Sequence, residues 1–120
     1  MSTTPTPGHE VRGSTTGRPL MAALDLFGRR WALRMLWELR HGPLGARALR
    51  AVCDGMSSSV LYQRLDELTT ADLVTKNEDG DYELTPIGAE VSTALEPLGN
   101  WADRWAQSLE AGDHKRVESQ

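Results

Sequence analysis

The stretch from Asp54 to Leu68 constrains the fold more than any other part of the chain, because it combines a tight turn, a run of serines and a short amphipathic helix. Gly55 can supply the unusual backbone angle that a short connection between crossed helices needs, and Ser57 can cap the free amides of the next helix. Leucines at positions 61, 65 and 68 predict one apolar face. The pattern is typical of the second helix of a helix-turn-helix.

Small polar side chains occupy the other side of this predicted helix. We expect four of them to face away from the apolar stripe: Ser58, Ser59, Tyr62 and Gln63. A helix of this kind can lie on a small core and still present polar groups to a DNA groove.

The segment before the turn predicts further helices. Residues 19–40 carry apolar side chains at helical spacing interrupted at Gly28, which indicates two helices or one bent helix. The second part ends at His41-Gly42-Pro43, a helix stop signal. Residues 44–53 predict a short helix with Leu44, Ala48, Leu49 and Val52 inward, and with outward residues that include Arg47 and Arg50.

The segment after it predicts a hairpin and a new helix. Residues 73–76 and 82–84 have the composition of short strands, and Asp79-Gly80 between them favours a hairpin, because both residue types tolerate positive φ. At Thr85-Pro86 the threonine can cap a helix, and the missing N–H of proline costs nothing there. A helix should therefore begin at Pro86.

This last predicted helix carries a heptad-like apolar seam. The seam consists of Val91, Leu95, Leu98, Ala102, Trp105 and Leu109. Pro97 interrupts it and is expected to kink the helix or split it in two. A seam with this many apolar residues is more than a small domain needs to cover its own core. It therefore predicts packing against a second subunit.

The order of elements describes a winged helix-turn-helix, a mainly α domain with a small β-hairpin (α+β). We expect this domain to cover residues 18–111, with dimerisation helices in its N- and C-terminal segments. Residues 1–17, rich in Thr, Ser, Pro and Gly, and residues 112–120 are expected to be disordered tails.

Composition excludes several classes of protein. The chain has no Gly-rich phosphate loop, no paired His and carboxylate, and no nucleophile beside a base, so we expect no enzymatic activity. Its single cysteine, Cys53, and its scattered histidines predict neither a metal nor another cofactor. No apolar run approaches the roughly 20 residues that span a bilayer, and residues 1–17 lack the features of a signal peptide. We therefore expect a cytoplasmic protein without a membrane partner.

Charge is unevenly distributed along the chain. Residues 1–64 carry a net charge of +5 and residues 65–120 a net charge of −9, which together give the total of −4. A basic front half suits contact with phosphates, because each neutralised phosphate releases condensed counterions. The alternative is that these charges only keep the surface soluble.

Four segments resemble, in order, the HxlR family of bacterial winged helix-turn-helix transcriptional regulators, relatives of the MarR group. They are PLMAALDLFGRRW at 19–31, LRHGPL at 39–44, MSSSVLYQRLDEL at 56–68 and YELTPIG at 82–88. The segments run from residue 19 to residue 88, and the resemblance covers about residues 18 to 105. Many members have a cysteine directly before the proline, used to sense oxidants or electrophiles. Here that position is Arg18, so thiol sensing at this site is not available.

The resemblance implies a homodimer that binds double-stranded DNA, with two recognition helices in successive major grooves of a roughly palindromic operator. We expect a repressor, because repression is the commoner outcome for a small dimer without an activation surface. The expected DNA-binding residues are Arg47, Arg50, Ser58, Ser59, Tyr62, Gln63, Arg64 and Lys76. For Arg64 a salt bridge to Asp66, Glu67 or another helix is an equal alternative. The acidic wing tip, which DNA phosphates should repel, keeps a second function open: a winged-helix protein-interaction module that has lost DNA binding.

The tryptophan content raises the question of a small-molecule effector. Trp31, Trp37, Trp101 and Trp105 come in pairs from the two segments expected to build the dimer interface. Aromatic faces suit planar or cationic ligands, so these residues could line an effector pocket between subunits. The alternative is that they form ordinary core or interface.

Overall fold

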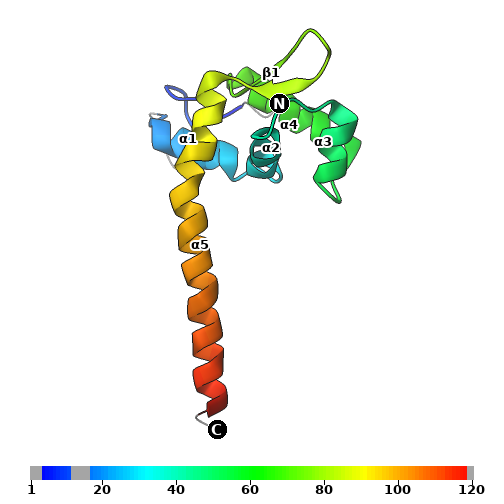
Figure 1. Ribbon diagram of the computed structural model, residues 1–120. Coiled ribbons are helices and arrows are strands. Elements are labelled where there is room, and N and C mark those ends of the chain that lie inside the picture. The colour runs from blue at the N-terminus through cyan, green and yellow to red at the C-terminus, as the bar shows by residue number, and fades with distance from the viewer. Residues whose placement is uncertain (1–3, 12–16, 119–120) are drawn as a thin grey trace.

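The computed structural model describes residues 4–11 and 17–118, with side chains as far as residue 112. The elements are α1 (Pro19–Phe27), α2 (Ala32–Leu39), α3 (Ala46–Val52), α4 (Ser58–Thr70), β1 (Val74–Lys76), β2 (Tyr82–Leu84) and α5 (Pro86–Glu118). In Figure 1 the first six elements form a compact head, and α5 begins in the head and then runs away from it as a rod. The predicted fold, a winged helix-turn-helix with a two-stranded wing, is confirmed.

The core of the head lies between α2, α3, α4 and the start of β1. Its buried residues are Met35, Leu36, Leu39, Leu49, Cys53, Met56, Leu61, Leu65, Leu68 and Val74. Burying a leucine or methionine side chain contributes about 1.5 to 3 kcal/mol. This cluster therefore supplies most of the free energy that holds the helices together.

The turn and helix that opened the sequence argument form as predicted. Gly55 has φ +90°, and the hydroxyl of Ser57 accepts a hydrogen bond of 3.3 Å from the amide of Val60. The leucines at 61, 65 and 68 are all buried. The turn glycine, the serine cap and the leucine spacing therefore predicted α4 and its buried face correctly.

The predicted inward face of α3 was wrong in part. Ala48 and Val52 are exposed, whereas Ala46, Leu49 and Cys53 contact the core. The helix begins at Ala46 rather than Leu44, and its single buried face follows positions i, i+3 and i+7 from there.

The wing is an antiparallel hairpin in which Val74 pairs with Leu84 and Lys76 with Tyr82. Leu44 makes an isolated bridge to Tyr82, which ties the wing to the segment before α3. The side-chain oxygen of Asn77 accepts from the amides of residues 79 and 81, both at 3.0 Å, and so shapes the turn.

Helix α5 starts at the predicted cap. The hydroxyl of Thr85 accepts from the amide of Gly88 at 3.0 Å and donates to the carbonyl of Asp72 at 2.6 Å. Pro97 lies inside the helix, which is continuous, so of the two expected outcomes, a kink or a split, the split does not occur. Proline removes one bond to the carbonyl four residues earlier, and Thr93 is exposed, so water can satisfy that oxygen.

Both segments predicted as tails include residues that the structure describes. Helix α5 continues through the predicted boundary at residue 111 to Glu118. Near the other end, Pro5 is buried and the amide of Gly8 bonds the carbonyl of Gly17 at 2.9 Å. The predicted tails also include residues 1–3, 12–16 and 119–120, which lie outside the described residues. No helix in the described part of the chain is long and apolar enough to cross a membrane.

We predict that Gly88→Ala destabilises the fold by about 1 to 3 kcal/mol, because the new Cβ would collide with the backbone carbonyl of Leu73. Gly99→Ala is the matched control in the same helix, where a Cβ meets open space. It should stabilise by up to about 1 kcal/mol. Thermal unfolding followed by circular dichroism measures both, and equal effects of the two changes would contradict the close packing of Gly88 on the backbone of Leu73, between α4 and β1.

Candidate nucleic-acid interface

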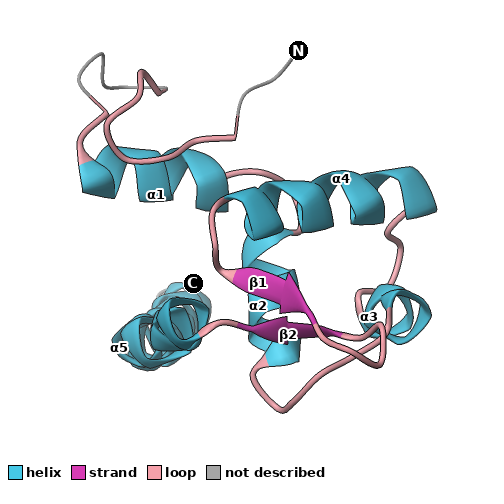
Figure 2. Cartoon of the chain, turned by 90° about the horizontal axis from the view of Figure 1, so that it is seen from above, coloured by secondary structure: helices cyan, strands magenta, loops and turns pink. Residues whose placement is uncertain are grey.

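The exposed face of α4 carries the polar set predicted from the sequence. All four of these residues are exposed: Ser58, Ser59, Tyr62 and Gln63. Tyr62 is 56% exposed. Figure 2 shows α4 along one side of the head, with the wing and α3 below it, α3 under its N-terminal end. These four residues therefore form a continuous polar surface on a helix whose opposite face is fixed in the core.

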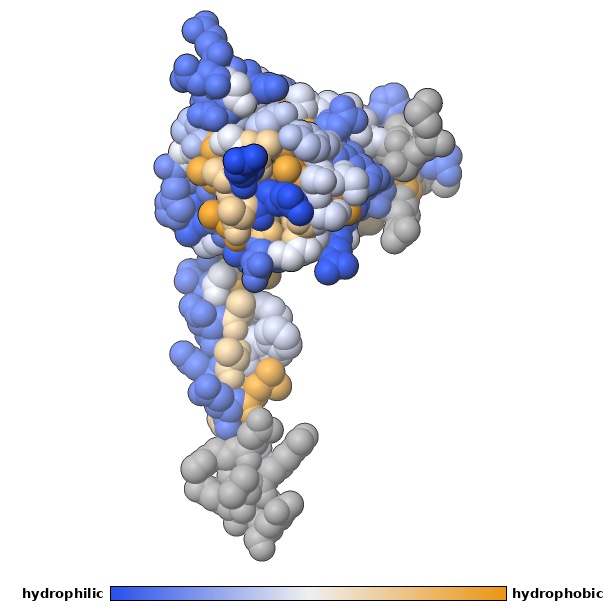
Figure 3. Space-filling view, turned by 90° about the vertical axis from the view of Figure 1, so that its right-hand side faces the viewer, coloured by the Kyte–Doolittle hydropathy of each residue, from blue (hydrophilic) through white to orange (hydrophobic). Residues whose placement is uncertain are grey.

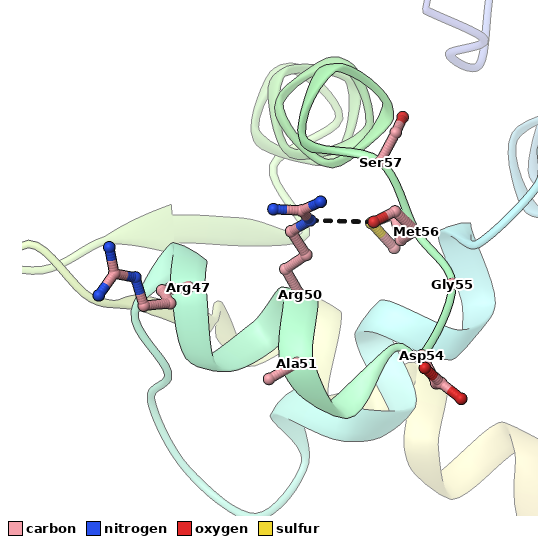
Figure 4. Close-up of a pocket in the computed structure, with 7 residues that line it drawn as sticks. All are labelled: Arg47, Arg50, Ala51, Asp54, Gly55, Met56 and Ser57. Carbon is pink, nitrogen blue, oxygen red and sulfur yellow. Dashed lines mark hydrogen bonds between the residues drawn. The ribbon is translucent and has the colours of Figure 1, made fainter.

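A shallow hollow of about 520 Å³ lies between α3 and the start of α4. Figure 4 shows the seven residues that line it: Arg47, Arg50, Ala51, Asp54, Gly55, Met56 and Ser57. The Nε of Arg50 donates to the carbonyl of Met56 at 3.0 Å. This bond links α3 to the turn before α4. It uses one of the five N–H donors of the guanidinium, so the other four can still bind an anion at the surface.

Arg47 stands in the first turn of α3, apart from the Arg50 bond (Figure 4). Its side chain is exposed and makes no ion pair or hydrogen bond with the described residues. A cation of this kind, beside a polar helix face, is well suited to a phosphate oxygen.

Arg64 is placed differently from the other predicted DNA-binding residues. Its side chain is only 14% exposed, and its Nη1 donates to Oε1 of Glu67 at 2.8 Å. Its Nε donates to the carbonyl of Arg30 at 2.7 Å. Of the two alternatives left open by the sequence, the structure has the salt bridge.

The wing presents little positive charge. Lys76 is exposed, with its Nζ 5.7 Å from the centre of the Tyr82 ring. Glu78 and Asp79 are exposed at the tip of the hairpin. Close approach of this tip to DNA phosphates is electrostatically unfavourable, which leaves α4 and α3 as the favourable part of the surface.

The tryptophans occupy two kinds of environment. Trp101 and Trp105 are stacked on α5, with ring centres 5.5 Å apart and planes 14° apart, and about half of each side chain is exposed. Trp37 is also exposed, with the guanidinium of Arg40 3.5 Å above its ring. Trp31 packs partly against the core in a left-handed backbone conformation, φ +76°.

An apolar pocket that the sequence did not predict lies beside α1. Its lining comes from the N-terminal segment, α1, the end of α4 and the start of α5: Pro5, Thr6, Pro7, Pro19, Ala22, Ala23, Leu26, Phe27, Ala71, Asp72, Leu73 and Ile87. None of these is a tryptophan. The proline-rich N-terminal segment read as a tail, and no local signal indicated that it would lie on α1.

Cys53 is completely buried beneath α3, and this burial raises the pKa of its thiol. Arg34 partly opposes that effect. A buried, protonated thiol is a poor nucleophile, so the surroundings of Cys53 favour an inert core residue.

Residues 26–110 match the HxlR-like helix-turn-helix family, by sequence, over the same elements that build this surface. The chain belongs to this family. A curated relative, the uncharacterized HTH-type transcriptional regulator YvaP of Bacillus subtilis, is 26% identical over 89 residues, which cover 69% of this chain and 82% of YvaP.

Solved structures of HxlR and MarR regulators have the same fold. The quinone-bound structure of YodB from B. subtilis is similar to this chain with a TM-score of 0.68 and 26% identity, over 71% of this chain and 96% of YodB. A transcriptional regulator of the MarR family from Enterococcus faecalis V583 has a TM-score of 0.64 and 32% identity, over 72% of this chain and 84% of its own. This HxlR-type chain is therefore a transcriptional regulator with a DNA-binding helix-turn-helix. Regulators of this kind are generally not enzymes.

Proposed function

We propose that this HxlR-type regulator is a repressor that binds a palindromic operator as a homodimer and reads its sequence with α4. The observation that carries the proposal is the exposed polar face of α4, on a capped helix whose leucines are buried. In this proposal Gln63 pairs with an adenine, since an amide can bond the N6 and N7 edge bidentately. Ser58, Ser59 and Tyr62 contact the neighbouring bases or sugars.

The same proposal gives the cations beside α4 a different task. Arg47 and Arg50 on α3, and Lys76 on the wing, contact phosphates and so fix the position of α4 without reading sequence. The exposed carboxylates of the wing tip then turn away from the backbone of the DNA. If the chain instead served as a protein-interaction module, these cations would contact no phosphate. Substituting them would then not change binding to DNA.

We predict that the chain binds DNA from upstream of its own gene with an affinity that falls steeply with salt. Gln63→Ala should weaken operator binding about tenfold or more, since a bidentate base contact is worth about 1 to 3 kcal/mol. Gln107→Ala is the control, because Gln107 is exposed on α5, away from α4. Gel shifts at two salt concentrations measure both. Equal binding by the Gln63 variant and the unchanged chain would exclude α4 as the reading element.

Unpartnered apolar side chains support the homodimer. On α5, Leu98, Trp101, Trp105 and Leu109 are each about half exposed, as is Leu24 on α1, and Leu20 on α1 is 65% exposed. Figure 3 shows part of this as a tan and orange stripe along the portion of α5 outside the head. Exposed apolar surface of this extent is unusual for a monomer and is typical of a protein interface.

We predict that Leu98→Asp converts the dimer to a monomer, because it places a charge inside the proposed seam. Gln107→Asp is the matched control, since the helical period puts position 107 on the opposite face of α5. Sedimentation equilibrium gives the mass of each. A dimer that survives Leu98→Asp would show that the seam does not form the interface.

An aromatic or planar effector is the last part of the proposal. Quinone-bound YodB is a structural relative, and the four tryptophans Trp31, Trp37, Trp101 and Trp105 offer aromatic surface near the proposed dimer contacts. With Arg18 before Pro19 and Cys53 buried, binding would be reversible rather than through a thiol adduct.

We predict that a soluble benzoquinone quenches the tryptophan fluorescence of the chain saturably and leaves its mass unchanged. Saturation distinguishes a bound ligand from collisional quenching, which grows linearly with quinone concentration. Mass spectrometry after incubation tests for an adduct. Linear quenching would argue against a site, and a stable adduct would argue against reversible binding.

A further inference from the structure

A buried charge cluster connects the recognition helix to the other end of the head. Glu67 on α4 is a buried carboxylate, and its two oxygens face different arginines. Oε1 accepts from Arg64 at 2.8 Å, and Oε2 forms an ion pair with Arg29 at 3.0 Å, without the alignment of a hydrogen bond. Arg29 lies between α1 and α2, so this cluster spans two segments far apart in the sequence.

Arg64 makes the second link between the same two segments. While its Nη1 holds Glu67, its Nε donates to the backbone carbonyl of Arg30 at 2.7 Å. One guanidinium thus bonds a carboxylate on its own helix and a carbonyl in the α1–α2 connection. The fork geometry of arginine allows this, and the single ammonium of lysine does not match it.

The connection held in this way is a constrained part of the backbone. Trp31, the next residue, has φ +76°, a region that a bulky side chain rarely adopts. The contacts of Arg64 and Arg29 secure this connection against α4. They also join α4 to α1, which carries the exposed Leu20 and Leu24 of the proposed dimer face.

We propose that Arg64 and Glu67 are positioning residues for DNA recognition. They set the orientation of α4 on the head, and in a dimer they set the two α4 helices relative to each other, whereas Arg64 touches no phosphate. The inference rests on the proposed function, in which α4 enters the major groove. It assigns to Arg64 a role through protein geometry instead of the direct contact expected from its place in the helix.

Direct contact and positioning predict opposite effects of Glu67→Gln. If Arg64 contacted phosphate, loss of the Glu67 charge would release it, raise operator affinity and steepen the salt dependence, by about 0.9 in the slope of log K against log salt for one added phosphate. If the pair positions α4, the same change lowers operator affinity and leaves the slope unchanged.

Arg64→Lys is the second test and keeps the net charge of the chain. A lysine can replace an arginine at a phosphate but not in the two-way bond to Glu67 and Arg30. We expect Arg64→Lys to weaken operator binding at least tenfold while binding to scrambled DNA at low salt is retained. Arg104→Lys, an exposed position on α5, is the matched control and should bind as the unchanged chain does.

The experiment is fluorescence anisotropy of labelled operator and scrambled duplexes over a series of salt concentrations, with thermal unfolding of every variant. A purely structural role would lower the unfolding temperature but leave the ratio of operator to scrambled affinity unchanged in folded protein. That outcome, or near-normal operator binding by Arg64→Lys, would overturn the inference alone. If Glu67→Gln fails to fold, Arg64→Lys decides the question. Absence of DNA binding by the unchanged chain would overturn the proposed function together with this inference.

Discussion

The fold depends on the burial of one face of α4. Leu61, Leu65 and Leu68 are almost completely buried against α2, α3 and β1, and the neighbouring elements are arranged around that contact. The opposite face of the same helix is exposed to solvent. Apolar and polar residues therefore alternate along α4 at helical spacing. A one-residue shift of α4 against the core would rotate its side chains by about 100° and move the leucines out of the core. The Ser57 cap stabilises the first turn, which leads into this buried face.

Features that depend on neighbouring residues were predictable from the sequence. The Ser57 and Thr85 caps, the Asp79-Gly80 hairpin and the leucine period of α4 each report on a local conformation, and each gave the right element. Features that depend on tertiary contact were not. The α1–α2 connection meets Glu67 only after folding, so the i, i+3 pair of Arg64 and Glu67 was visible while the Arg29 partner was not.

Two outcomes that the sequence alone did not decide have the same physical origin: the inward face of α3 and the effect of Pro97 on α5. The inward face of α3 was assigned with the helix starting at Leu44, whereas this residue bridges to Tyr82 in the wing and the helix starts later. Pro97 was expected to kink α5 or to split it in two. The helix is not split, because the surrounding turns are exposed and solvent can satisfy the carbonyl that loses its bond. In both cases the hydrogen-bonding partner of a backbone group decided the local structure. For Leu44 that partner is Tyr82 in the wing, and for the carbonyl four residues before Pro97 it can be solvent.

The anchoring of α5 has a mechanical consequence. The helix is 33 residues long, about 50 Å, and it is fixed at its base by Thr85, whose hydroxyl holds the carbonyl of Asp72 just after α4. A rod clamped at one end converts a tilt of a few degrees at the base into a displacement of several ångström at the tip. Contacts made far along α5 can therefore shift the orientation of the head. In the proposed dimer, a modest change in how the distal half of α5 is held would change the spacing between the two α4 helices.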